Sequence, residues 1–119
     1  VETAIRTVLE FNEAFNRHDV TSMMQLISED CIFESAAPAP DGTTYTGKEA
    51  ITRYWQEHFR KSTQTHIAIE EIFSAGLRCI MLWTSNWVDP VGTNKHVRGA
   101  DMFKVKDGSI CEQLSYTKG

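Results

Sequence analysis

The chain has 119 residues, of which 41% are hydrophobic and 24% charged, so it is long enough for one folded domain and too apolar for a disordered segment. Its net charge of −4 comes without a basic stripe, and no apolar run approaches the roughly 18 residues that cross a membrane. These features argue against a nucleic-acid or membrane partner. Three cysteines at wide spacing in apolar segments predict reduced thiols in a cytoplasmic protein.

The first half of the chain shows helical periodicity. Apolar residues at i, i+3, i+4 and i+7 spacing predict a helix from Glu2 to about Arg17. Asp19 can cap a short second helix whose apolar residues are Met23, Met24, Leu26 and Ile27. After a short strand at residues 31–35, the Pro-Ala-Pro and Asp-Gly segments predict a twelve-residue loop over residues 36–47, which we expect to form the rim of a binding site. A third helix is predicted over residues 48–60, with an aromatic buried stripe.

The second half reads as strands. Four strand-like runs cover residues 65–74, 78–88, 95–106 and 109–116, and Asp107-Gly108 is a strong hairpin signal between the last two. Strands of this length favour a curled antiparallel sheet. With helices across its concave side, such a sheet would enclose a cone-shaped cavity, so we predict one α+β domain over residues 1–119.

One carboxylate interrupts an apolar strand face. Alternate positions from Val97 place Asp101 between Gly99 and Phe103. An ionised carboxylate is costly to bury without a partner, so Asp101 is either paired, held protonated by a raised pKa, or completed by a ligand. The structural alternative is a buried carboxylate that hydrogen-bonds a Tyr or Trp and only fixes packing.

Other side chains are candidates for the same site. His58 lies one helical turn beyond Tyr54 and could shuttle a proton to Asp101, although a lone His on an apolar helix face is more often a core residue. Glu34 could supply a second carboxylate, with exposure at a strand end as the alternative. Aromatic residues on the third helix and on the strands favour an aromatic-lined pocket, and the predicted ligand-binding residues are Phe15, Tyr45, Tyr54, Trp55, Trp83, Trp87 and Phe103.

Three segments together carry a family resemblance: "FNEAFNRHDVTSMMQLISEDCIFES", "TGKEAITRYWQEHF" and "RGADMFKVKDGSICEQLSYTKG". The chain resembles the SnoaL-like polyketide-cyclase group of the nuclear-transport-factor-2-like superfamily, which also holds ketosteroid isomerase. The resemblance implies a curved antiparallel sheet wrapped around N-terminal helices. It is weak evidence for one reaction, because the superfamily hosts cyclases, isomerases, dehydratases, epoxide hydrolases and binding domains.

The resemblance places Asp101 on the family's pocket carboxylate, which is the acid of the cyclases and the protonated oxyanion-hole acid of the isomerase. The other isomerase groups are missing, because Ser35 stands where its general base would be and Phe11 where its tyrosine would be. An epoxide-hydrolase site would need an arginine beside Asp101. Arg98, three residues away on a strand, should face the opposite side.

The sequence therefore predicts a binding site for a small apolar or aromatic carbonyl compound, with Asp101 and His58 as catalytic residues of a cyclase, isomerase or dehydratase. The alternative is a binding or carrier module with the same cavity. No metal-ligand spacing, phosphate loop or nucleophile motif is present, so we predict no metal and no cofactor. The opposite strand face, with Arg98, Ala100, Met102 and Lys104, favours a homodimer, as the resemblance also implies.

Overall fold

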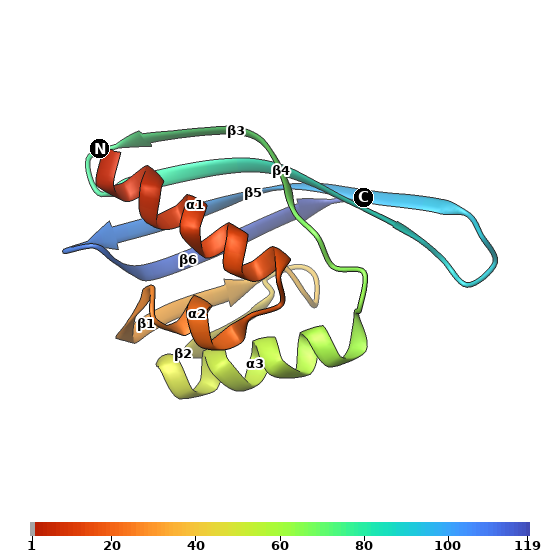
Figure 1. Cartoon of the computed structure of the whole chain (residues 1–119), viewed down its shortest axis with the longest axis horizontal. Helices are drawn as coiled ribbons and strands as arrows, with labels where there is room; N and C mark the ends of the chain where they lie inside the picture. The colour runs from red at the N-terminus through yellow and green to blue at the C-terminus, as the bar shows by residue number, and fades with distance from the viewer. Residues whose placement is uncertain (1) are drawn as a thin grey trace.

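The computed structural model describes residues 2–119. Its elements in chain order are α1 (Glu2–Asn16), α2 (Val20–Met24), β1 (Ile27–Ser35), β2 (Thr43–Thr46), α3 (Lys48–Lys61), β3 (Ala68–Ala75), β4 (Arg78–Val88), β5 (Asn94–Lys106) and β6 (Ser109–Lys118). The strands form one curved sheet in the order β2-β1-β6-β5-β4-β3, and the helices lie against one face of it (Figure 1). The predicted α+β fold is confirmed.

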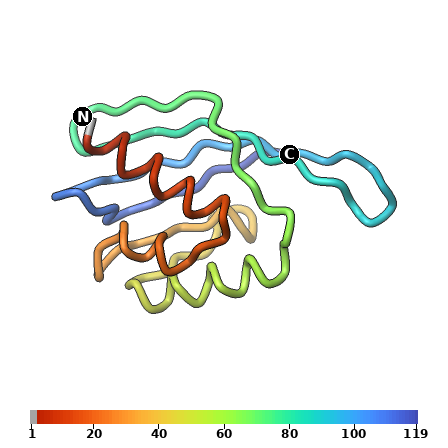
Figure 2. Tube along the Cα trace, in the orientation of Figure 1, coloured from red at the N-terminus to blue at the C-terminus, as the bar shows by residue number. Residues whose placement is uncertain are grey.

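Strand pairing joins the two halves of the chain. β3 to β6 form the predicted antiparallel series, and β1 pairs with β6 in parallel and with β2 antiparallel. The trace in Figure 2 shows the distal part of the β4–β5 hairpin extending beyond the helices. None of the described helices has the length and apolarity that a membrane span requires.

The helices form where the periodicity predicts them, since each buries an apolar stripe. In α1, Val8, Phe11 and Phe15 are buried at i, i+3 and i+7 spacing. Asp19 caps α2 by accepting a hydrogen bond from the Ser22 amide at 3.1 Å. The expected extent of this helix is wrong, because α2 ends at Met24, Leu26 follows it, and Ile27 begins β1. α3 buries Trp55 among other residues of its inner stripe. These stripes form the core with the concave face of the sheet.

The Asp107-Gly108 turn joins β5 to β6 as predicted, with φ angles of 54° and 78°. The predicted loop over residues 36–47 is wrong in part, because residues 43–46 form β2 and pair with the end of β1. The sequence does not predict this strand, because its threonines give no alternation of apolar and polar residues. The remaining connection contains Gly42. A Cβ atom added at this position would lie 1.8 Å from the Ser35 carbonyl oxygen, which is too close for a side chain.

Candidate functional site

A cavity of about 550 Å³ lies between the concave face of the sheet and the helices α1 and α3. This is the size range of small-molecule binding sites. Six of the seven aromatic residues predicted to bind a ligand line it, and these are Phe15, Tyr54, Trp55, Trp83, Trp87 and Phe103. The seventh, Tyr45, is not a lining residue. Its ring lies against the rings of Phe33 and Tyr54, with centroids 6.0 and 4.7 Å apart.

Asp101 lies in the cavity wall on β5, with 7% of its surface exposed. Its Oδ1 accepts a hydrogen bond from Trp83 Nε1 at 3.0 Å, and its Oδ2 accepts one from Gln113 Nε2 at 2.9 Å. Trp83 comes from β4 and Gln113 from β6, so the two strands that flank β5 hold the carboxyl group between them. Asp101 is thus a partnered carboxyl group within an apolar cavity.

Two opposing effects act on the proton of Asp101. Burial raises the pKa of the carboxyl group above its ordinary value, and the hydrogen bonds from Gln113, Ser115 and Trp83 act in the opposite direction. Burial is the larger effect. The same donors that hold the acid would therefore stabilise the carboxylate after it has released a proton.

Gly99 allows the indole of Trp83 to reach Asp101. Gly99 and Trp83 are cross-strand partners on β5 and β4. A Cβ on Gly99 would lie 2.4 Å from Cζ2 of the Trp83 ring and 2.6 Å from the Tyr116 carbonyl oxygen. A side chain at this position would therefore displace the ring that donates to Asp101. Glycine inside a strand commonly marks such a close approach.

His58 also lines the cavity, but its hydrogen bond goes to Thr65 and not to Asp101. His58 Nε2 lies 3.3 Å from Thr65 Oγ1, and the Thr65 hydroxyl donates its proton to the Ser62 carbonyl oxygen at 2.9 Å. His58 Nε2 must then carry the hydrogen, which leaves a lone pair on Nδ1 of the neutral ring. Burial, together with the nearby His18, lowers the pKa of His58 and so favours this neutral form.

The remaining sequence candidates lie as follows. Ser35 and Phe11 line the cavity. Glu34 lies between the inward-facing Phe33 and Ser35 and is not a lining residue. Arg98 faces away from Asp101 as expected, and its guanidinium lies 3.7 Å from Glu70.

Sequence reasoning missed Gln113 and Ser115 on β6, which share the inner face with Asp101. Alternation along β6 could have placed them on one face. Their register against β5 could not have been deduced from that alternation. Gly99 carried a detectable signal, since a lone glycine within a predicted strand indicates either a bulge or a close contact.

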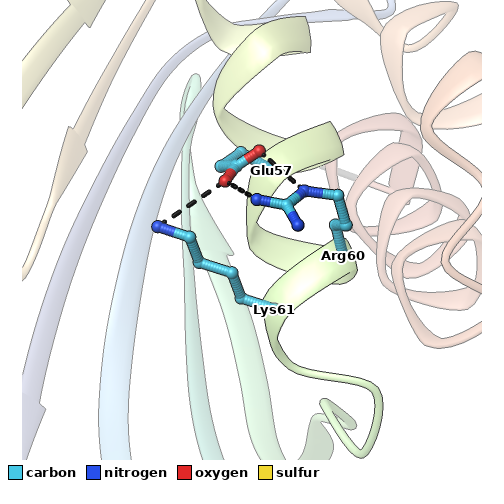
Figure 3. A network of polar contacts seen from close by, with 3 residues as sticks. All are labelled: Glu57, Arg60 and Lys61. Carbon is cyan, nitrogen blue, oxygen red and sulfur yellow. Dashed lines mark hydrogen bonds and ion pairs between the residues drawn. The ribbon is translucent and has the colours of Figure 1, made fainter.

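The segment after α3 and the end of β4 both line the cavity, and the space between them is called its mouth below. Gln64 makes two hydrogen bonds to the backbone of Val88, from its Nε2 to the Val88 carbonyl oxygen at 3.0 Å and from the Val88 amide to its Oε1 at 3.3 Å. Lys61 also lines the mouth. Figure 3 shows Lys61 and Arg60 sharing the carboxylate of Glu57, with Lys61 Nζ 3.6 Å from Glu57 Oε1. These ion pairs are exposed and add little to stability.

The described residues contain no group of three or more His, Cys, Asp or Glu side chains that could hold a metal ion. The cysteines Cys31, Cys79 and Cys111 are free thiols. Burial raises the pKa of Cys31 to about 12, so this thiol is a poor nucleophile.

Comparisons with known proteins agree with this architecture. An NTF2-like protein of unknown function from Mesorhizobium loti is 33% identical, with a TM-score of 0.82 over 99% of this chain and 93% of that one. A candidate polyketide cyclase from Xanthomonas campestris pv. campestris is 23% identical, with a TM-score of 0.77 over 97% and 90% of the two chains. TerC, co-crystallised with polyporic acid, is 17% identical, with a TM-score of 0.81 over 98% and 92%. The last two show the fold alone.

A search of curated proteins gave no significant match. The SnoaL-like domain family, in contrast, matches residues 8–113, which is most of the chain. This range contains α3, β5 with Asp101, most of α1 and the part of β6 that carries Gln113. This protein therefore belongs to the SnoaL-like domain family, within the NTF2-like fold.

Proposed function

We propose that this protein binds a mainly apolar or aromatic carbonyl compound in the cavity and that Asp101 acts on it as a general acid and base. The observation that carries the proposal is the position of Asp101, a buried carboxyl group on the wall of a largely aromatic cavity. A buried acid with a raised pKa keeps its proton to a higher pH than an exposed one and can donate it to a carbonyl oxygen. The reaction is of the cyclase, isomerase or dehydratase type and needs no cofactor.

One carboxyl group can serve both halves of such a reaction. In a cyclisation, an enol carbon of the substrate attacks a carbonyl carbon, and Asp101 gives its proton to the carbonyl oxygen as the carbon–carbon bond forms. The carboxylate, stabilised by Trp83 and Gln113, then takes the proton from the enol oxygen and is restored to the acid. His58 is the candidate for a second proton transfer, in which its Nδ1 would accept a proton from the substrate.

A binding or carrier module is the second candidate, and one observation favours it. The groups that hydrogen-bond Asp101 are Trp83, Gln113 and Ser115, none of which exchanges protons readily near neutral pH. A second titratable group at Asp101 would favour an enzyme. The two candidates share the ligand and differ only in turnover.

Proton exchange at carbon separates the two candidates. In heavy water, α-tetralone exchanges its α-hydrogens through the enol, and NMR measures the rate. We expect the protein to accelerate this exchange and Asp101→Asn to remove the acceleration, since an amide cannot transfer the proton. Binding without any acceleration by the wild type would assign the protein to the carrier class.

Binding itself is measured with fluorenone, a planar polycyclic ketone, and with fluorene, the hydrocarbon that lacks its oxygen. Both should quench tryptophan fluorescence and raise the melting temperature, because the cavity walls are aromatic. Trp87→Ala and Tyr54→Ala should weaken both ligands. Asp101→Asn should weaken the binding of fluorenone more than that of fluorene, since an amide is a weaker donor than a carboxylic acid. Equal losses of affinity for the two ligands would mean that Asp101 does not touch the oxygen.

A further inference from the structure

Two asparagines on α1 hold the segment that leads into β3. Asn16 uses both sides of its amide on Ile67: its Nδ2 donates to the Ile67 carbonyl oxygen at 3.0 Å, and its Oδ1 accepts from the Ile67 amide at 2.8 Å. Asn12, one helical turn earlier, donates from Nδ2 to the same carbonyl oxygen at 3.2 Å. Because a carbonyl oxygen can only accept, the NH₂ of Asn12 must face Ile67 and its amide oxygen must face away.

The amide oxygen of Asn12 has no partner among residues 2–119, although the side chain is only 8% exposed. In the described part of the chain, the one fully enclosed side-chain nitrogen or oxygen without a partner is Trp55 Nε1. Asn12 Oδ1 is therefore open to a space, and the space that Asn12 lines is the cavity. Asn16 is not a lining residue.

An amide oxygen that opens into a cavity is completed by an O–H or N–H group there, from a water molecule or from a ligand that displaces the water. Asp101 belongs to the sheet, and Asn12 belongs to α1, which packs across β3 to β6. The two polar groups therefore lie on opposite walls of an otherwise largely aromatic cavity. A ligand between these walls can carry one oxygen toward each.

We propose that Asn12 is a second ligand-binding residue of the cavity, whose Oδ1 accepts a hydrogen bond from a hydroxyl group of the ligand. The substrate class is then a hydroxylated aromatic or polycyclic ketone, with its carbonyl oxygen at Asp101 and a phenolic or enolic hydroxyl at Asn12. This inference rests on the proposed function and adds the second recognition point. Asn12 is a specificity-determining residue in it, with no part in proton transfer.

The test compares fluorenone with its ring-hydroxylated isomers and with the matching methoxy derivatives, which lack the donor. At least one hydroxyfluorenone should bind wild type about 3- to 10-fold more tightly than fluorenone, the range expected for one net hydrogen bond, and its methyl ether should lose this gain. Asn12→Leu, of similar size but without an amide, should remove the gain, so that the hydroxyfluorenone and fluorenone bind this variant with similar affinity. Asn12→Ser is a second variant in case the leucine disturbs folding.

Asn16→Leu is the matched control, since it also removes hydrogen bonds to Ile67 but changes a residue that does not line the cavity. A hydroxyl gain that disappears in Asn12→Leu and persists in Asn16→Leu supports the inference. The inference would be overturned if no hydroxyfluorenone bound more tightly than fluorenone, or if both leucine variants lost this difference in affinity equally. In either case, fluorenone binding that depends on Asp101 would still support the proposed function. A crystal structure of the complex in which only a water contacts Asn12 Oδ1 would also overturn it. Failure of every ketone to bind would overturn both proposals.

Discussion

Single residues set the chemistry of this cavity through their hydrogen-bond partners. Asp101 is surrounded by apolar side chains and is held by donors from β4 and β6. In the protonated state, Trp83 can still donate to one oxygen, and the Gln113 amide can turn so that its oxygen accepts the acid proton. The same pocket therefore satisfies both states of the carboxyl group, which a proton-transfer residue requires.

Asp101→Asn should stabilise the protein at neutral pH. The folded-state pKa of Asp101 lies above the unfolded value of about 3.9, so the folded protein keeps a proton that the unfolded chain releases. Asp101 then opposes folding increasingly as pH rises from the unfolded to the folded pKa. Thermal unfolding measured as a function of pH should show the melting temperature of the variant rising relative to that of the wild type in this window. The difference should be about 4 °C for each kcal/mol by which the free energy of unfolding increases. If the wild type instead became more stable relative to the variant as pH rises, the hydrogen bonds to Asp101 would lower its pKa by more than burial raises it.

Gly99→Ala should weaken both the fold and the site. The added Cβ would overlap the Trp83 ring and the Tyr116 carbonyl oxygen, and overpacking of this kind costs about 1–3 kcal/mol. Chemical unfolding measures this loss, and NMR of the Trp83 indole N–H reports its hydrogen bond to Asp101. Ala100→Ser is the control, because it enlarges the neighbouring residue on the other face. An unchanged indole resonance in Gly99→Ala would show that the ring does not need this space.

At the scale of elements, the cavity mouth depends on one contact between two segments. The Gln64 amide makes the pair of hydrogen bonds to Val88 that a neighbouring strand would make. It ties the segment after α3 to the end of β4, in the part of the β4–β5 hairpin that extends beyond the helices (Figure 1).

Gln64→Ala should loosen the mouth without unfolding the protein, since both hydrogen bonds are exposed and contribute little to global stability. We expect faster hydrogen exchange at the Val88 amide and several-fold faster dissociation of fluorenone, measured by stopped-flow fluorescence. Gln56→Ala, an exposed glutamine on α3, is the control. Rates equal to those of Gln56→Ala would mean that the contact does not gate the cavity.

At the scale of the whole molecule, the helices cover one face of the sheet and leave the other face open (Figure 1). On that outer face, Ile80 pairs with Met102 and Leu82 with Ala100 across β4 and β5. All four side chains are partly exposed. A partly apolar sheet face of this kind favours a two-fold interface.

We predict that the protein is a homodimer through this outer face. Met102→Glu should give a monomer, because two-fold symmetry would bring two buried charges together. Sedimentation velocity at micromolar concentration measures the state, and Thr44→Glu on the edge strand β2 is the control. A monomeric wild type would contradict the prediction.

Local patterns in the sequence predict much of the fold without any knowledge of tertiary contacts. The helical stripes of α1 and α3, the Asp19 cap and the Asp107-Gly108 turn depend on covalent geometry and near neighbours, so the sequence alone predicts them. Alternation along β5 likewise identified Asp101 as an inward-facing carboxylate, for the same reason.

Tertiary structure decided which groups meet. The parallel pairing of β1 with β6, the donors that Gln113 and Ser115 supply to Asp101, and the position of Tyr45 behind Phe33 all depend on strand register. The open amide oxygen of Asn12 depends on a contact with Ile67, 55 residues away. Alternation tells which face a side chain occupies but not which residue lies beside it, because register and sheet curvature are set by the packing of the whole chain.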